Sequence, residues 1–232
     1  MRRTMTQYEM ISKRRSVRKY RDGPVPDAVL EEIRAYIDEL EQMDGQNARF
    51  DIVSGPQQFG APHCVTAYSN EGTEAFVNVG YCLQDIDLCL QGIGLGSLWY
   101  GSKNSTGNGP DGYCIKLIFG NTDVPLRKGE EDFKRMGVNE MSNIDNAVAR
   151  AVRLAPSARN TQPWQLIFGD GGLTIRYRGS GLLKGLLKKK LSKIDLGIAA
   201  RCAAAALEHE GKEIRGISVS EDKKDLAVHI VY

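Results

Sequence analysis

The sequence predicts an α+β fold assembled from two half-chains of similar plan. Each half presents an amphipathic helix, then strands around a longer apolar helix, in the same order. Short stretches also match between the halves, since residues 45–53 (GQNARFDIV) follow the first helix of one half as residues 158–168 (ARNTQPWQLIF) follow that of the other. Internal similarity of this kind indicates a duplication.

The first half is expected to run helix, strand, helix, strand, over residues 27–42, 63–69, 74–94 and 113–120. Asp27 is the expected N-cap of the first helix. Gly92, Gly94 and Gly96 are expected to end the long helix in a tight turn that exposes backbone N–H groups at residues 97–102.

The second half repeats this plan with two helices, residues 144–155 and 193–211, and three strands, residues 164–168, 173–178 and 226–232. Residues 120–142 are polar and marked by glycine and proline, which is typical of a linker. We therefore divide the chain into a first half at 1–120, a crossover linker at 121–142 and a second half at 143–232.

Composition narrows the class of protein. With 232 residues, 41% hydrophobic and 26% charged, the chain can bury one large core or two small ones. Its five cysteines form no CxxC pair and its three histidines are scattered, so neither a disulfide framework nor a zinc site is indicated. The absence of a long apolar run predicts a soluble, cytoplasmic, unprocessed protein with no membrane partner.

Positive charge is concentrated at the N-terminus. Residues 1–21 contain eight Lys or Arg and one Glu, whereas the whole chain carries only +2. Arginine forks grip phosphate oxygens and a serine hydroxyl adds a donor, so the stretch KRRSVRKYR (13–21) is a candidate phosphate clamp. An exposed basic arm and a nucleic-acid contact are the alternatives. Against nucleic acid, no aromatic residues are interleaved as a stacking platform.

A polar turn between two prolines is the second candidate site. In LAPSARNTQPWQLIF (154–168), Ser157 and Asn160 can present a hydroxyl and an amide to a flat ligand, above a buried Trp164. The alternative is a loop that satisfies only its own backbone. The lysine-rich stretch 179–193 is either a solvated amphipathic segment or a surface that steers ligands or contacts membranes.

Three of these motifs together resemble the FMN-dependent nitroreductase family. RRSVRKYRDGPVP is similar to the family's phosphate clamp, and APSARNTQPW is similar to its Pro-Ser-Ser loop along the flavin ring. GIGLGSLWYG resembles the segment that meets flavin N5 and O4. The resemblance implies an α/β sandwich with mixed or antiparallel sheets flanked by helices.

What the resemblance implies for single residues follows by position. Phosphate and ribityl contacts fall on Arg14, Arg15, Ser16 and Arg18, with Lys134 and Arg135 completing the phosphate site and Arg127 and Lys128 as the competing pair. The flavin ring would meet Tyr100, Gly101, Pro156, Ser157, Ala158 and Asn160. No side chain is expected to be catalytic, although Arg159 is a weak candidate for charge stabilisation or substrate contact. Ala158 replaces the family's second Ser and so removes one hydroxyl.

The order of the motifs departs from the family. Clamp and loop lie close in an ordinary member's chain, whereas here they stand in opposite halves. In the family's homodimer one subunit supplies the clamp and the other the loop, so this chain resembles a branch in which one chain has the fold of the dimer. We expect a single-chain pseudo-dimer, one FMN per chain, and a monomer or a homodimer of pseudo-dimers.

The resemblance implies ping-pong chemistry, in which NADH or NADPH reduces FMN and a small-molecule electron acceptor, such as a nitroaromatic or a quinone, is reduced in turn. Two alternatives are a flavin-binding protein without catalysis and a basic-arm binder of nucleic acid or an acidic partner. The first would be yellow yet inert towards NADH and NADPH; the second would be colourless and sensitive to salt.

Overall fold

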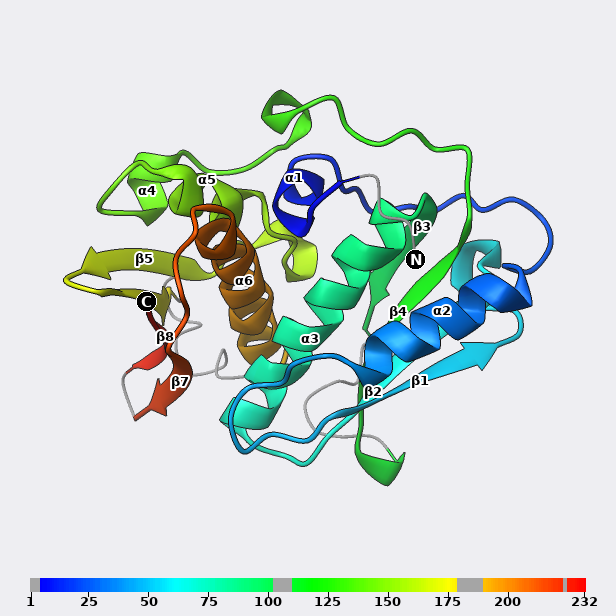
Figure 1. Ribbon diagram of the computed structural model, residues 1–232, viewed down its shortest axis with the longest axis horizontal. Helices are drawn as coiled ribbons and strands as arrows, with labels where there is room; N and C mark the ends of the chain where they lie inside the picture. The colour runs from blue at the N-terminus through cyan, green and yellow to red at the C-terminus, as the bar shows by residue number, and fades with distance from the viewer. Residues whose placement is uncertain (1–4, 102–109, 179–189, 223–224) are drawn as a thin grey trace.

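The computed structural model describes residues 5–101, 110–178, 190–222 and 225–232. These form two antiparallel four-stranded sheets (Figure 1). One sheet has the order β1 (Arg49–Ser54), β2 (His63–Tyr68), β4 (Tyr113–Asn121), β3 (Leu95–Tyr100), and the other has β5 (Trp164–Gly169), β6 (Gly172–Tyr177), β8 (Leu226–Val231), β7 (Gly216–Glu221). In both sheets the four strands, counted along the chain, lie side by side in the order first, second, fourth, third. This shared order confirms the repeated plan.

Two long helices of equal length lie between the sheets. α3 (Thr73–Gly92) and α6 (Lys190–His209) have 20 residues each and pack side by side at the centre of the molecule (Figure 1). Both are buried along nearly their whole length, as their apolar sequences predict. The short α1 (Gln7–Ile11) rests on both of them.

Shorter helices complete the layers. α2 (Asp27–Asp38) covers one sheet, and α4 (Val138–Met141) and α5 (Ala147–Leu154) lie beside the other (Figure 1). α5 begins later than expected because the side chain of Asn146 accepts the Ala149 N–H at 2.8 Å and so caps the helix. α2 ends at Asp38, and beyond it the Gln42 side chain bonds the backbone N–H and C=O of Ala48, which holds this segment as a loop.

The two long helices cross at a pair of glycines. A Cβ on Gly80 would lie 2.1 Å from the Ile194 carbonyl oxygen, and a Cβ on Gly197 would lie 1.9 Å from the Val77 carbonyl oxygen. Gly197 corresponds to Gly80, and Ile194 to Val77, at the same offset along the chain. Each contact therefore repeats the other across a local two-fold axis. The chain is therefore a pseudo-dimer with an α+β fold.

One expectation about the glycine run was wrong. Gly92 ends α3 and Gly94 turns the chain with a φ of 88°, but Gly96 lies inside β3. A Cβ there would lie 2.8 Å from the side chain of Val17, because the N-terminal segment packs directly against this strand. The glycine thus serves close packing of strand and clamp and not a turn.

The three histidines have structural partners, as their sequence positions predict. His63 accepts the Val25 N–H at 3.0 Å, His209 stacks on Tyr8 and His229 bonds Thr174. Among the described residues, no helix combines the length and the apolar character that crossing a membrane requires.

Candidate functional site

The clamp segment is fixed along the free edge of β3. The Val17 N–H donates to the Ser97 carbonyl at 2.9 Å, and Ser16 and Ser97 form a parallel bridge. This pairing adds residues 16–17 to the sheet and turns the side chain of Arg14 inward. Arg14 is 2% exposed and its Nε lies 2.8 Å from Asp87 Oδ2 on α3. The first arginine of the motif is thus anchored in the core.

A guanidinium offers more N–H groups than Asp87 accepts here. Arg14 Nη2 is buried and finds no hydrogen-bond acceptor among the described residues, and neither does Arg135 Nε. Asp87 also accepts hydrogen bonds from Ser97 Oγ and Gln91 Nε2, so its oxygens are shared. Buried donors without acceptors are costly, and an anion bound here would satisfy them.

Two arginines of the linker join Arg14. Arg127 Nη1 donates to the Arg14 carbonyl, and the guanidinium carbons of Arg127 and Arg135 lie 4.0 and 5.5 Å from the centroid of the Phe133 ring. Burial, and then the charges of Arg14 and Arg127, lower the pKa of Arg135 to about 10. Burial and the neighbouring Arg14 and Arg15 likewise lower the pKa of Arg127. We call Arg14, Arg127 and Arg135 the arginine cluster.

The competing basic pairs of the sequence each contribute one arginine to this cluster. The side chains of Lys128 and Lys134 are exposed. The backbone carbonyls of these two residues accept hydrogen bonds, from Lys13 Nζ and Asn160 Nδ2. The outer clamp residues lie nearer the surface, since Arg15 Nη1 donates to the Pro125 carbonyl at 2.8 Å and Arg18 is exposed.

The proline-flanked loop lies against the linker segment that carries Arg135. Asn160 donates to the Lys134 carbonyl at 3.0 Å and accepts from Arg135 Nη1, while the Met136 N–H donates to Gln162 Oε1 at 2.9 Å. Ser157 Oγ accepts the Gln162 N–H at 2.9 Å, and Trp164 is fully buried as predicted. Arg135 thus contacts the loop of the second half directly and lies near enough to Arg14 of the clamp for that charge to lower its pKa.

The loop backbone is strained. Arg159, Asn160 and Gln162 have φ values of 54°, 58° and 49°, a region that non-glycine residues rarely adopt. Strain of this kind persists only where surrounding contacts over-determine it and gathers at ligand sites. Arg159 itself is exposed at the loop tip.

The chain also matches a known family. A family model described as "Putative TM nitroreductase" matches residues 6–206, a range that holds the clamp, α3, most of α6, the arginine cluster and the loop. The chain belongs to this nitroreductase family.

One solved structure shows the same fold over the whole nitroreductase chain. A crystal structure described as a putative nitroreductase from Thermotoga maritima aligns with 100% of this chain and 95% of its own, at a TM-score of 0.72 and 20% identity. A nitroreductase-like protein from Bacillus cereus aligns with 63% of this chain and 100% of its own, at a TM-score of 0.48 and 17% identity. An FMN-dependent nitroreductase from Clostridium difficile aligns with 54% of this chain and 93% of its own, at a TM-score of 0.44 and 20% identity. No curated protein matches the sequence.

A buried carboxylate under the loop was not anticipated from the sequence of this nitroreductase. The Ala158 N–H donates to both oxygens of Asp195, at 3.0 and 3.2 Å. Asp195 is 4% exposed, and burial raises its pKa to about 7. The signal was available, because Asp195 precedes Gly197 as Asn78 precedes Gly80, and Asn78 Oδ1 accepts the Met43 N–H at 2.9 Å.

The end of β3 meets the start of α6. Tyr100 is half-buried with Lys116 Nζ 5.6 Å from its ring centroid, and a Cβ on Gly101 would lie 3.7 Å from the Leu191 side chain. The rest of the expected turn, at 102–109, and residues 179–189 of the lysine-rich stretch lie outside the described residues.

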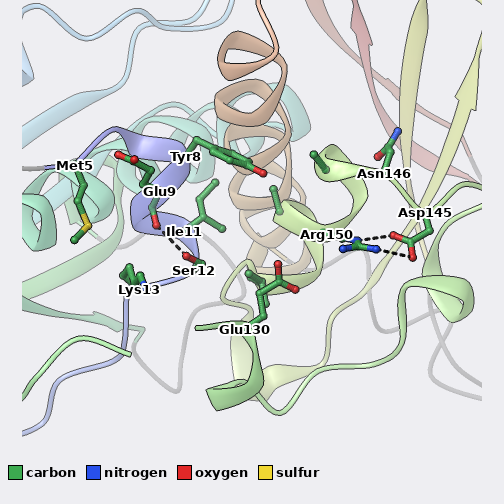
Figure 2. A pocket seen from close by; sticks show the side chains of 13 residues that line it. Met5, Tyr8, Glu9, Ile11, Ser12, Lys13, Glu130, Asp145, Asn146 and Arg150 are labelled. Atoms are coloured by element: carbon green, nitrogen blue, oxygen red, sulfur yellow. Dashed lines mark hydrogen bonds and ion pairs between the residues drawn. The ribbon is translucent and has the colours of Figure 1, made fainter. Parts of the chain in front are cut away.

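Two hollows among the described residues have linings that include none of the predicted flavin contacts. One, of about 510 Å³, separates α1 from the start of α5 (Figure 2). Glu9 and Lys13 stand on one side of it, and the ion pair of Asp145 and Arg150 stands on the other. The second, of about 570 Å³, lies between the loop at 45–46, the start of α3 and β7.

Proposed function

We propose that this nitroreductase family member binds one FMN per chain and acts as an NADH- or NADPH-dependent reductase of small electron-poor acceptors. The observation that supports the proposal most directly is the arginine cluster. Arg14 pairs with Asp87, Arg127 donates to the Arg14 carbonyl, and the charges of both act on Arg135. Arg14 Nη2 and Arg135 Nε are buried and have no acceptor among the described residues. A phosphate dianion is the anion that such forks bind best.

The donor set fits the phosphate end of FMN. Arg14, Arg127 and Arg135 would hold the phosphate, with Ser16 and the partly exposed Arg15 and Arg18 as further donors. We assign Arg127 and Arg135, one from each competing basic pair, in place of either complete pair. Because phosphate charge would offset the mutual repulsion of these arginines, binding would also restore their pKa values.

The ring end is assigned to the meeting point of the two halves. Pro156, Ser157, Ala158 and Asn160 would line one side of the isoalloxazine ring from the second half. Tyr100 and Gly101 would approach it from the first half, where the end of β3 reaches α6.

The chemistry supplied by bound FMN would be hydride acceptance at N5 from NADH or NADPH, followed by reduction of a nitroaromatic, a quinone or a similar acceptor. The protein's own part is orientation. The strained loop and the strand edge fix the two faces of the site, and the arginine cluster fixes the phosphate. No side chain is required to carry the redox step, so Arg159 is left a possible contact for the acceptor.

The asymmetry of the two halves supports a single flavin per chain. In the first half the clamp segment pairs with β3, the outer strand of its sheet. In the second half the only described bridge of this kind joins Ser142 to Leu166 on β5, at the opposite edge, so no described segment pairs with the outer edge of β7. The second half thus lacks the strand-edge clamp.

The test compares FMN with riboflavin, which lacks the phosphate. We expect the purified protein to show flavin absorbance and to reduce FMN with NADH or NADPH. The double variant Arg127→Gln/Arg135→Gln should bind FMN about 100-fold more weakly, since two charge-assisted contacts are lost, and riboflavin nearly as before. Arg150→Gln, which removes an exposed arginine of another ion pair, is the matched control. Equal loss of FMN and riboflavin would contradict the assignment of the phosphate.

A further inference from the structure

The loop that lines the proposed flavin site is held from two sides. Arg135 contacts Asn160 on one side, and Asp195 of α6 accepts the Ala158 N–H on the other. Both Asp195 oxygens lie within 3.2 Å of that nitrogen. Asp195 is therefore the direct link between the central helix pair and the backbone of the loop.

The pseudo-dimer supplies its own comparison for this contact. Asn78 occupies the equivalent place on α3, two residues before the crossing glycine, and its Oδ1 accepts the Met43 N–H at 2.9 Å in the loop after α2. Asn78 Nδ2 in turn donates to Gln42 Oε1 at 2.8 Å. A neutral amide thus performs the same architectural task in the half that lacks the Pro-Ser loop. The carboxylate in the other half is not required for the fold alone.

The surroundings of Asp195 leave its charge uncompensated. Among the described residues no cation forms an ion pair with it, and the Ala158 N–H is the hydrogen-bond donor that stabilises the charged form. The titratable group that faces it from β6 is Tyr177, whose pKa is raised by burial and further by Asp195. Burial places the pKa of Asp195 at about 7, so its charge changes near neutral pH.

We propose that Asp195 is a positioning residue for the flavin loop and that FMN affinity follows the charge of this carboxyl group. The charged form accepts the Ala158 N–H more strongly than the protonated form does, because hydrogen bonds to an ionised acceptor are shorter and stronger. The ionised carboxylate therefore holds the loop in its strained, ring-lining shape, and protonation loosens it. This inference rests on the proposed function.

The test is the pH dependence of FMN binding to the wild type and to Asp195→Asn. The phosphate of FMN also titrates near pH 6, so the informative quantity is the ratio of the two dissociation constants at each pH. At pH 6 the wild-type carboxyl is mostly protonated and should resemble the amide. The dissociation constant of the variant divided by that of the wild type should therefore be roughly five-fold higher at pH 8 than at pH 6. A ratio that does not change with pH would overturn the proposal.

A flavin-free measurement separates this proposal from the proposed function. In NMR spectra of the protein alone, the amide proton of Ala158 should shift with a midpoint near pH 7, and this titration should vanish in Asp195→Asn. An Ala158 amide that does not titrate would overturn the inference even if FMN binds. If FMN fails to bind the wild type, the proposed function falls, and the Ala158 titration still decides whether Asp195 holds the loop.

The reciprocal variant Asn78→Asp is the matched control. It places a carboxyl group under the loop of the first half, which has no proposed contact with FMN. Its FMN affinity should follow pH as the wild type does. A changed FMN profile in Asn78→Asp would show that a buried charge alters binding from either half and would contradict a local role for Asp195.

Discussion

Gly80 and Gly197 pack each against the backbone of the other's helix, and this reciprocal contact is the centre of the molecule. A side chain at either position would meet a carbonyl oxygen that belongs to an equally buried helix. Close approach of the two helices is what allows one chain to place its two sheets as a dimer would, with the clamp of one half facing the loop of the other.

The first prediction concerns this crossing. Gly197→Ala should lower the free energy of unfolding by about 3 kcal/mol, because its Cβ would lie 1.9 Å from the Val77 oxygen and the helices must move apart. Gly92→Ala is the control, since a Cβ at that helical position would meet no other part of the chain within 4 Å and the substitution should be neutral or slightly stabilising. Urea unfolding curves measure both, and equal midpoints for the two variants would contradict the account.

The second prediction concerns the anchor of Arg14. Asp87→Asn removes the buried carboxylate and should destabilise the flavin-free protein by about 3–5 kcal/mol, because a buried guanidinium loses its ion pair. Inorganic phosphate should recover more of the melting temperature in this variant than in the wild type, since the freed arginine binds the anion.

Asp145→Asn is the control for the buried pair. Its partner Arg150 is largely exposed, so the loss should stay below about 1 kcal/mol and should not respond to phosphate. A phosphate response of the same size in both variants would show that the anion acts on the whole protein and not at the arginine cluster.

The third prediction follows from the raised pKa of Asp195. Between the pKa of an unfolded aspartate, near 4, and about 7, the folded protein holds a proton that the unfolded chain has released. Stability linked to this group is therefore present at low pH and is lost as pH rises to about 7. Asp195→Asn should stabilise the flavin-free protein at pH 8 by up to about 4 kcal/mol, and much less at pH 4.5.

Chemical denaturation of the wild type and the variant at the two pH values measures this difference. The comparison must be made between variants, because other groups titrate in the same range and cancel only in the difference. A constant gap between the two unfolding free energies would mean that Asp195 keeps the same charge in the folded and unfolded states.

Much of this arrangement could be predicted from the sequence. The glycine-terminated, apolar stretch at 74–94 indicated α3, and the repeat of helix and strand order indicated the duplication. The pseudo-dimer came from the resemblance to the nitroreductase family. Local patterns suffice there, because periodicity of apolar residues reports directly on burial.

The site itself was less predictable, because its contacts join residues far apart in the chain. No local pattern shows that Arg14 pairs with Asp87. Nor does one show that Arg127 and Arg135 are partly buried near Arg14 while Lys128 and Lys134 are exposed. Gly96 was assigned to a turn because glycine often marks one, whereas its role depends on Val17 packing against β3. Asp195 lies within an apolar helix, and its signal in the sequence is its place two residues before Gly197, which matches that of Asn78 before Gly80.

The central claim is that one chain carries one flavin site, with the phosphate clamp from its first half and the ring-lining loop from its second. Titration of the flavin-free protein with FMN, followed by absorbance and by calorimetry, tests it most directly. The account predicts saturation at one FMN per chain, with binding weakened both by Arg127→Gln/Arg135→Gln and by Ser157→Ala/Asn160→Ala. Saturation at two FMN per chain, or full affinity in the Ser157→Ala/Asn160→Ala variant, would contradict it.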